Sequence, residues 1–214
     1  MADRKPLLVV FARAPVAGRV KRRLAREIGS VAAVGWYRHQ IAKLLREVGQ
    51  DPRWDTVLAV TPDTAGRPGG GFPPCVRPGI RPGVPRIVQG RGDLGRRMEA
   101  VFRQPRPGPI AIIGSDIPGI SATIIAEAFG MMGRADAVFG PAADGGFWLV
   151  GLARGRRRVP AGLFDNVRWS THHALADSLA TLAEHRISFA APLADVDTAT
   201  DLVSLGRHAR AGLA

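Results

Sequence analysis

The chain has 214 residues and a formal net charge of +12, and 46% of its residues are hydrophobic. This length suits one domain spanning residues 1–214, and the apolar content excludes global disorder. No apolar run is long enough to cross a bilayer, and the charged N-terminus does not have the pattern of a signal peptide. The single cysteine, Cys75, cannot form an intrachain disulfide, which fits a reducing compartment. We therefore expect a cytoplasmic protein with no membrane span.

The positive charge indicates an anionic partner, because 30 lysines and arginines face 18 acidic residues. Phosphorylated small molecules and nucleic acid both fit this charge, and a GC-rich genome would produce the same arginine excess without any partner. The basic residues are spread through the sequence, with no zinc-finger spacing and no aromatic-rich strand of the RNA-binding type. A non-catalytic nucleic-acid-binding protein is therefore an alternative, but nucleic acid is not the expected partner.

Short apolar runs alternate with segments of helical periodicity. The run over residues 7–12 is typical of a buried parallel strand, and a basic helix is predicted from near residue 20. A second helix is predicted over 31–48 and a strand over 56–60. Residues 62–85 are crowded with proline and glycine and predict a long loop.

The second half of the chain continues this alternation. Ser121 has the position of an N-cap, and Ser170 or Thr171 has the same position before a later helix. The predicted strands are 86–88, 109–114, 137–140, 147–152 and 187–190, and the predicted helices are 94–102, 121–132, 170 or 171 to 185, and 198–205. The alternation predicts a three-layer α/β fold with a mostly parallel central sheet.

The first candidate site is the loop that follows the first strand, within residues 11–24. Ligands of open α/β sheets bind at the carboxyl ends of the strands, and a loop of small residues entering a helix offers backbone N–H groups to phosphates. Lys21 and Arg23 would add positive charge. The loop is neither a Walker A motif nor a dinucleotide fingerprint. A solvated basic helix face explains the same residues equally well.

The second candidate site is Asp116, which follows the apolar run 110–113 and precedes Pro118. A carboxylate at the end of a strand is well placed to hold Mg²⁺ or Mn²⁺ against substrate phosphates, since Mg²⁺ takes one or two protein carboxylates and completes its shell with water and phosphate. The alternative is an aspartate that only serves a turn or a helix cap.

The third candidate site is Asp144, which precedes two glycines in the segment 140–148. Paired glycines allow a ligand to approach the backbone closely, so Asp144 is a candidate contact for a sugar hydroxyl or for the metal. An Asp-Gly turn between two strands accounts for the same residues.

The fourth candidate site lies in the segment 195–202. Alternation along an extended chain places Asp195 and Asp197 on one side, so either is a candidate second metal ligand. Thr198 and Asp201 also have the spacing of a capping box, which would explain this segment without a ligand.

Taken together, these segments resemble the DUF2064 family of bacterial GT-A-like transferases, sometimes labelled glycosyltransferases, within the nucleotide-diphospho-sugar transferase superfamily. Six family motifs occur in order along nearly the whole chain. The matching residues are Phe11, Pro15, Gly18, Val20, Lys21, Arg23 and Leu24, then Gln89, Gly92, Asp93, Leu94, Gly95, Arg97 and Met98, then Gly114, Ser115, Asp116 and Pro118, then 140–142 and 144–146, then 169–171, and finally 195–198, Asp201 and Leu202.

The resemblance implies a Rossmann-like GT-A fold that binds a nucleotide or nucleotide-sugar donor together with Mg²⁺ or Mn²⁺. Asp116 would be the metal-binding carboxylate and Asp197 a second ligand, while Lys21 and Asp144 are the candidate catalytic residues. The residues expected to contact the nucleotide are Phe11, Ala12, Arg13, Gly18, Lys21, Arg23, Gln89, Gly92, Asp93, Gly95 and Ser115.

The resemblance also implies group transfer from the activated donor to an acceptor of unknown identity. A glycosyltransferase moves the sugar and releases a nucleoside diphosphate, and this is the version expected first. A nucleotidyltransferase, similar to molybdopterin-cofactor cytidylyltransferases and phospholactate guanylyltransferases, releases pyrophosphate instead. The chain departs from the family pattern where Phe147 and Trp148 replace tyrosines, which leaves the acceptor undefined.

Overall fold

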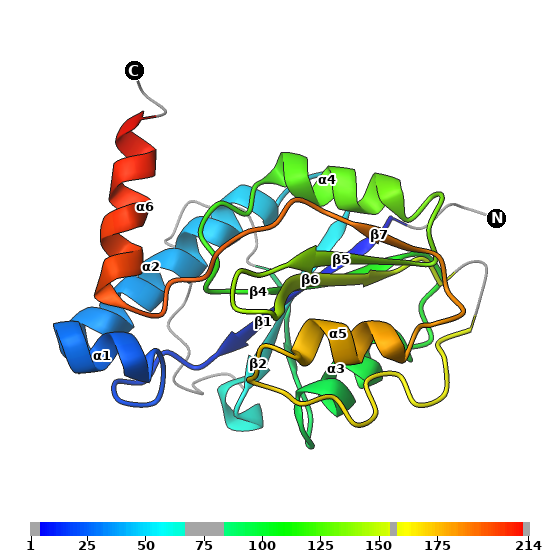
Figure 1. Cartoon of the computed structure of the whole chain (residues 1–214), viewed down its shortest axis with the longest axis horizontal. Coiled ribbons are helices and arrows are strands. Elements are labelled where there is room, and N and C mark those ends of the chain that lie inside the picture. Colours follow the sequence, from blue (N-terminus) through cyan, green and yellow to red (C-terminus); the bar gives the residue numbers. More distant parts are fainter. Residues whose placement is uncertain (1–4, 67–83, 155–157, 212–214) are drawn as a thin grey trace.

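The computed structural model describes residues 5–66, 84–154 and 158–211, with side chains in the last helix described up to residue 205. A twisted sheet lies between two layers of helices, with α2 and α4 on one face and α3 and α5 on the other (Figure 1). The strands are β1 (Leu7–Arg13), β2 (Asp55–Thr61), β3 (Arg86–Val88), β4 (Ile110–Gly114), β5 (Ala137–Pro141), β6 (Phe147–Leu152) and β7 (Ile187–Phe189). The helices are α1 (Arg22–Ile28), α2 (Ser30–Val48), the 3₁₀ helix η1 (Asp63–Gly66), α3 (Leu94–Phe102), α4 (Ala122–Met131), α5 (Ala174–Ala180) and α6 (Ala199–Ala211).

The seven strands have the order β3-β2-β1-β4-β6-β5-β7. Strand β6 runs antiparallel to both β4 and β5, and every other pairing among the described strands is parallel. The predicted three-layer α/β fold with a mostly parallel sheet is therefore confirmed.

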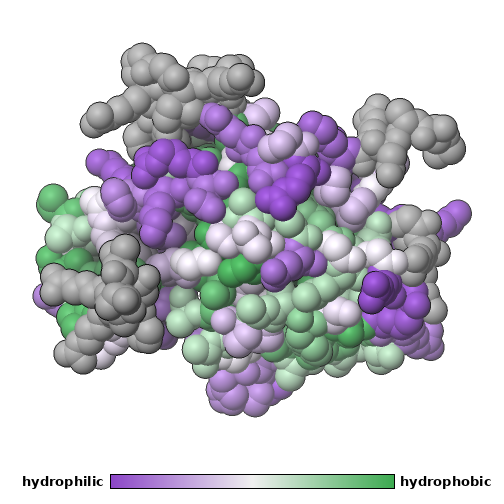
Figure 2. All heavy atoms as spheres, turned by 90° about the horizontal axis from the view of Figure 1, so that it is seen from above, coloured by the Kyte–Doolittle hydropathy of each residue, from purple (hydrophilic) through white to green (hydrophobic). Residues whose placement is uncertain are grey.

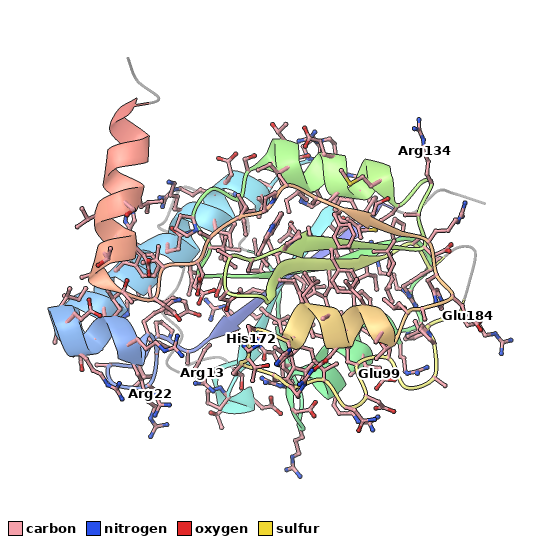
Figure 3. The ribbon with its side chains drawn as sticks, in the orientation of Figure 1. Arg13, Arg22, Glu99, Arg134, His172 and Glu184 are labelled. Carbon is pink, nitrogen blue, oxygen red and sulfur yellow. The ribbon has the colours of Figure 1, made fainter. Side chains whose placement is uncertain are left out.

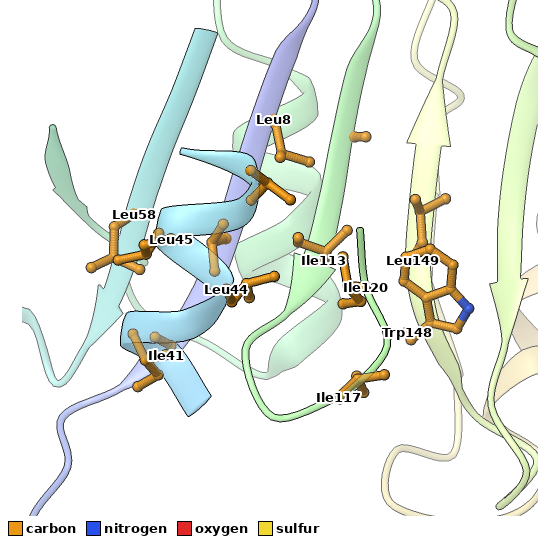
Figure 4. Close-up of a cluster of buried hydrophobic side chains, with 14 of the residues drawn as sticks. Leu8, Ile41, Leu44, Leu45, Leu58, Ile113, Ile117, Ile120, Trp148 and Leu149 are labelled. Atoms are coloured by element: carbon orange, nitrogen blue, oxygen red, sulfur yellow. The ribbon is translucent and has the colours of Figure 1, made fainter. Parts of the chain in front are cut away.

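Strand β1 is apolar along its length because both of its faces are covered. Leu8 and Val10 are buried against the helices α2 and α4, whereas Leu7 and Val9 are buried on the opposite face against α3 and α5. Figure 4 shows Leu8 together with other side chains of the first cluster. A strand covered on both faces reads as a continuous apolar run, which is why the sequence located it well.

Helix α2 supplies much of the first cluster. Its buried positions include Val34, Tyr37, Ile41, Leu44 and Val48, which recur every three or four residues and so form one face. The structure confirms the helix predicted over 31–48, and this face places one tyrosine under the carboxyl end of β1.

The helix predicted from Ser170 or Thr171 to residue 185 is wrong in both bounds. Helix α5 spans only 174–180, and Ser170 has a φ of 61°, a left-handed conformation that cannot belong to the helix. The hydroxyl of Thr171 donates to the carbonyl of Arg168 at 2.7 Å and accepts from the N–H of His173 at 3.2 Å. The polar pair therefore forms a separate turn before the helix.

The long loop predicted over 62–85 falls mostly outside the described residues, which resume at residue 84. Its first part forms η1. None of the helices in the described ranges is long and apolar enough to span a membrane. The face of the molecule that carries α4 has separate hydrophilic and hydrophobic areas (Figure 2).

Gly140 in β5 provides a test of how tightly the sheet is packed. A Cβ at this position would lie 2.4 Å from Cε2 of Trp148, whose side chain is fully buried and whose indole N–H donates to the carbonyl of Ala191 at 3.0 Å. Because the ring is held, we expect Gly140→Ala to destabilise the protein by about 1–3 kcal/mol in urea unfolding.

Gly35 is the matched control, since it lies within α2 and a Cβ there would meet nothing within 4 Å. Gly35→Ala should leave stability unchanged or raise it by up to ~1 kcal/mol through helix propensity. Equal effects of the two substitutions would contradict the packing described for Gly140.

Candidate functional site

The strand order alone indicates where a ligand would bind. The chain leaves β1 toward β2 on one side, whereas β4 lies on the other side of β1. Such a reversal opens a crevice at the carboxyl ends of β1 and β4, and ligands of open α/β sheets bind there. The basic loop follows β1 and Asp116 follows β4, so the topology brings the first two candidate sites to one place.

Lys21 lies at the centre of this crevice. Its ammonium Nζ is 2.7 Å from Oδ2 of Asp116 and 2.9 Å from Oδ1 of Asp197, and only 5% of its side chain is exposed. Nζ also lies 5.9 Å from the ring centroid of Trp36, a distance that permits a cation–π interaction. Three candidate residues from distant parts of the sequence are therefore joined by one buried cation.

The conformation and the charge state of Lys21 follow from this position. Lys21 precedes α1 with φ 46° and ψ 49°, a left-handed conformation that a non-glycine residue keeps only where its surroundings demand it. Burial lowers its pKa, but the charges and hydrogen bonds of Asp116 and Asp197 raise it more, so the pKa of Lys21 lies above its ordinary value. The side chain is therefore a firmly charged ammonium.

Tyr37 links the end of β1 to the residue that follows β4. Its hydroxyl accepts from the N–H of Arg13 at 3.0 Å and forms a 2.9 Å hydrogen bond with the hydroxyl of Ser115. Burial raises the pKa of Tyr37, so the phenol stays neutral. The sequence reasoning missed this residue, because its position on the apolar face of a helix predicts only a core role.

Asp197 is held in place by the start of α6. Oδ2 of Asp201 accepts from the N–H of Asp197 at 2.9 Å, from the N–H of Thr198 at 2.7 Å and from the Thr198 hydroxyl at 2.8 Å. The predicted capping box is therefore present, and it fixes the carboxylate that contacts Lys21. Arg23, whose side chain is 74% exposed, places Nη1 3.3 Å from the other oxygen of Asp197.

Two adjoining clefts open along the basic loop. One of about 450 Å³ is lined by Arg13, Arg19, Val20, Lys21, Arg22, Arg23, Tyr37, Asp116, Ser170 and Asp197. The other, of about 630 Å³, lies at the carboxyl ends of β1 and β2 and is lined by Arg13, Ala14, Val16, Gly18, Arg19, Arg22, Thr61, Pro62, Thr64 and Ala65. Figure 3 shows Arg13 and Arg22 at this end of the sheet. These volumes match those of small-molecule sites.

Gln89 has a structural role that the sequence did not predict. Its Nε2 donates to the carbonyls of Ala12 at 3.1 Å and Ala59 at 2.9 Å, and its Oε1 accepts from Arg97 at 2.7 Å. Both polar atoms of this buried amide are thus bonded within the protein and tie β1, β2 and α3 together. Contact of Gln89 with a nucleotide stays a prediction.

Asp93 caps the start of α3, because its carboxylate accepts from the N–H of Arg96 at 2.8 Å. Gly92 just before it has a φ of 98°, which favours glycine. Gly95 lies within the helix, and a Cβ there would come within 2.9 Å of both Phe164 and Trp169. Local geometry thus explains these three residues without a ligand, and their contact with a nucleotide stays a prediction.

Phe11, Ala12 and Ser115 lie beneath the crevice and outside the described linings of its two clefts. Phe11 packs with the cluster on the α3 and α5 face, whereas Ala12 belongs to the cluster on the other face. Ser115 is buried and bonded to Tyr37. Their contact with a nucleotide also stays a prediction.

Asp144 lies in the tight turn between β5 and β6. The N–H of Ala142 donates to the carbonyl of Gly146 at 3.0 Å, and Oδ1 of Asp144 accepts from the N–H of Gly146 at 2.9 Å. The structure thus shows the hairpin turn that the sequence left open as an alternative. A catalytic role for Asp144 stays a prediction.

Asp195 shows that the acidic residues share one electrostatic environment. Burial raises its pKa to about 6, and the negative charges of Asp197, Asp144 and Asp116 raise it as well, whereas Lys21 opposes the shift. The other three aspartates singled out in the sequence therefore lie close enough to Asp195 to affect it.

The carboxylates of Asp116 and Asp197 suit a divalent cation in chemistry and in spacing, because one ammonium already bonds to both. Among the described residues, no group of three or more histidine, cysteine or acidic side chains could hold a metal ion. A metal here would take two protein carboxylates and complete its shell with water and phosphate oxygens, which is the usual arrangement for Mg²⁺.

Residues 44–171, more than half of the chain, match the family described as "uncharacterized protein conserved in bacteria (DUF2064)". The chain belongs to the DUF2064 family. This confirms the resemblance inferred from the six motifs. A comparison with curated proteins gives no match.

Several solved structures share the fold of this DUF2064 protein. A protein from Desulfovibrio desulfuricans, provisionally described as a nucleotide-diphospho-sugar transferase, superposes with a TM-score of 0.79 at 24% identity, over 91% of this chain and 83% of that chain. The 4-diphosphocytidyl-2C-methyl-D-erythritol synthase of Anaerococcus prevotii gives a TM-score of 0.58 at 8% identity, over 97% and 99% of the two chains. A CMP:2-keto-3-deoxy-manno-octonic acid synthetase complexed with CTP gives 0.54 at 14% identity, over 98% and 100%. At these identities the likeness establishes the fold, which is that of nucleotide-diphospho-sugar transferases.

The raised pKa of Asp195 predicts a pH-dependent gain in stability from Asp195→Asn. The folded-state pKa of about 6 exceeds the ordinary 3.8, so the folded protein binds more protons and loses stability as pH rises between these values. Asp195→Asn has no carboxyl group to ionise at this position and so avoids this loss of stability. Because Asp195 is only half-buried, solvent screening limits the gain to about 1 kcal/mol, or roughly 2–4 °C in Tm.

Thermal unfolding of both proteins from pH 4 to pH 8 checks this prediction. The difference in Tm should be small near pH 4 and reach its full size above pH 6.5. A difference that stays constant across this range would show that Asp195 does not titrate as described.

Proposed function

We propose that the protein is a metal-assisted transferase that takes a nucleotide-activated donor. The observation that carries this proposal is the joining of Lys21, Asp116 and Asp197 at the strand-order reversal, beside a cleft lined with arginines. The fold shared with nucleotide-diphospho-sugar transferases supports it.

The residues of the crevice have complementary tasks in such a transfer. Arg13, Arg19 and Arg22 line both clefts and would bind the phosphates of the donor. Asp116 and Asp197 would hold Mg²⁺ or Mn²⁺, which supplies neutralisation of phosphate charge when it is bound. Group transfer of this kind demands positioning and electrostatic stabilisation more than covalent chemistry from the protein.

Glycosyl transfer from a nucleotide-sugar is the first version of this proposal. The resemblance in the sequence favours this version, because proteins of this family are sometimes labelled glycosyltransferases, and the Desulfovibrio structure is provisionally described as a nucleotide-diphospho-sugar transferase. The sugar would pass to an acceptor hydroxyl, and the bond to the nucleoside diphosphate would break. Asp144, on the turn near the other aspartates, is the proposed acceptor of the hydroxyl proton.

Nucleotidyl transfer is the second version, and the charge of the smaller cleft favours it. Five cationic side chains of residues 13–23 line this cleft with only two carboxylates, an excess of three positive charges. Such an excess suits a triphosphate better than the diphosphate of a nucleotide-sugar. In this version the acceptor attacks the nucleotidyl phosphorus and pyrophosphate departs.

We expect Asp116→Asn to abolish metal-dependent nucleotide binding while the protein remains folded. The measurement is a thermal-shift panel of nucleoside triphosphates and nucleotide-sugars with and without Mg²⁺ or Mn²⁺. A ligand at about 100 times its Kd adds roughly 2.7 kcal/mol, which raises the Tm of a protein of this size by several degrees.

The matched control is Asp165→Asn, since Asp165 is an exposed carboxylate that contacts Arg96 outside both clefts. It should keep the full metal-dependent shift. A shift with a triphosphate supports nucleotidyl transfer, and one with a nucleotide-sugar supports glycosyl transfer. Wild-type affinity in Asp116→Asn would overturn the metal role, and no shift with any nucleotide would overturn the proposed function.

A further inference from the structure

The ammonium of Lys21 lies where a metal bridging the two carboxylates would lie. It bonds to Oδ2 of Asp116 at 2.7 Å and to Oδ1 of Asp197 at 2.9 Å. The second oxygen of Asp197 also faces a cation, because Arg23 approaches it to 3.3 Å. A divalent ion bound by both carboxylates must therefore share its position with an existing cation.

Two cations cannot occupy this position together. A magnesium ion lies about 2.1 Å from its oxygen ligands, so an ammonium bonded to the same oxygens would be only a few ångströms away, where like charges repel strongly. The side chain of Lys21 is 5% exposed, so water cannot screen this repulsion well. Lys21 must withdraw before the metal can bind both carboxylates.

Withdrawal leaves the ammonium without its counter-charges unless the ligand supplies new ones. A buried charge that loses its partner is strongly destabilising. The phosphates of a nucleotide provide the missing negative charge, and the arginine-lined cleft that would hold them contains Lys21. Metal alone brings no such compensation.

We propose that Lys21 is the resident cation of the free protein, that a metal binds both carboxylates by displacing it, and that nucleotide phosphates favour this exchange. The substrate is then the metal–nucleotide complex, and free metal binds weakly. This inference rests on the proposed function, because it takes Asp116 and Asp197 as the metal ligands. Nucleotide and metal strengthen each other's binding by the same factor.

The test measures the binding of Mn²⁺ alone to the free protein by the loss of its electron paramagnetic resonance signal. We expect weak binding to the wild type and at least tenfold tighter binding to Lys21→Met, which removes the competing ammonium and keeps the apolar stem. The double variant Lys21→Met/Asp116→Asn should lose this gain.

Arg23→Met is the matched control, because it removes the same charge from the same aspartate but leaves the ammonium in place. It should change Mn²⁺ affinity by less than about threefold, since an exposed ion pair contributes little. If Arg23→Met gained as much Mn²⁺ affinity as Lys21→Met, the loss of one positive charge would explain both gains. That result would overturn the exchange. Equal Mn²⁺ affinity in the wild type and Lys21→Met would also overturn it.

A second measurement uses the wild type and so does not depend on the folding of Lys21→Met. An amine-reactive reagent followed by peptide mass spectrometry should label Lys21 slowly, and saturating Mn²⁺ should raise this rate severalfold as the side chain is released. Lys43, exposed on α2, serves as the internal reference. Bound Mn²⁺ with no change at Lys21 would overturn the exchange.

The two proposals fail in different ways. Wild-type nucleotide binding in Asp116→Asn removes the metal role and this inference with it. Tight binding of Mn²⁺ alone to the wild type, together with loss of metal-dependent nucleotide binding in Asp116→Asn, overturns only the exchange and leaves the proposed function standing.

Discussion

The buried ammonium of Lys21 is the constraint on which the rest of the site depends. Its two carboxylate partners come from the loop after β4 and from the segment before α6. Asp197 lies 176 positions away from Lys21 in the sequence. Truncating one member of a buried charge pair typically costs about 3–5 kcal/mol, since the other charge is left unpaired. The loop after β1, the end of β4 and the start of α6 are thus positioned as one unit.

Local backbone geometry also positions the groups around the Lys21 ammonium. The left-handed backbone of Lys21 turns its side chain inward at the start of α1, and the capping box of Thr198 and Asp201 orients Asp197 toward it. The N–H of Ala199 donates to Oε2 of Glu27 at 2.8 Å, which links α6 to α1 on the outer side. The left-handed backbone of Lys21 and the capping box at the start of α6 therefore belong to one arrangement, because both position groups of the same ion pair.

The strands and most helices could be predicted because their patterns are local. A strand buried on both faces, such as β1, is a continuous apolar run, and the N-cap of α4 at Ser121 has its predicted bond to the N–H of Ile124. Helix α5 was misplaced because Ser170 and Thr171 have the composition of a cap but form a separate turn. Local sequence does not distinguish these two uses of a hydroxyl.

The site was predictable in its parts but not in its connections. The sequence placed the loop of Lys21 and the carboxylate of Asp116 each at the end of a strand, but no local pattern pairs Lys21 with Asp197 across the chain. Tyr37 was missed because helical periodicity accounts for it as core. Gln89 was assigned to the nucleotide because its segment resembles the family, whereas its amide bonds show that a residue within a family motif can serve the scaffold.

The net charge of +12 can be interpreted from the contacts that individual arginines make in the structure. Arg168 and Asp177 form a paired contact at 2.8 Å, Arg103 contacts Glu99 at 2.7 Å, and Nη2 of Arg154 donates to the carbonyl of Gln104 at 2.6 Å. These three side chains hold turns and helices together. Cationic side chains do gather at the crevice, where residues 13–23 surround two carboxylates. This concentration of positive charge around an acidic pair is the electrostatic basis of the proposed binding of nucleotide phosphates together with a metal.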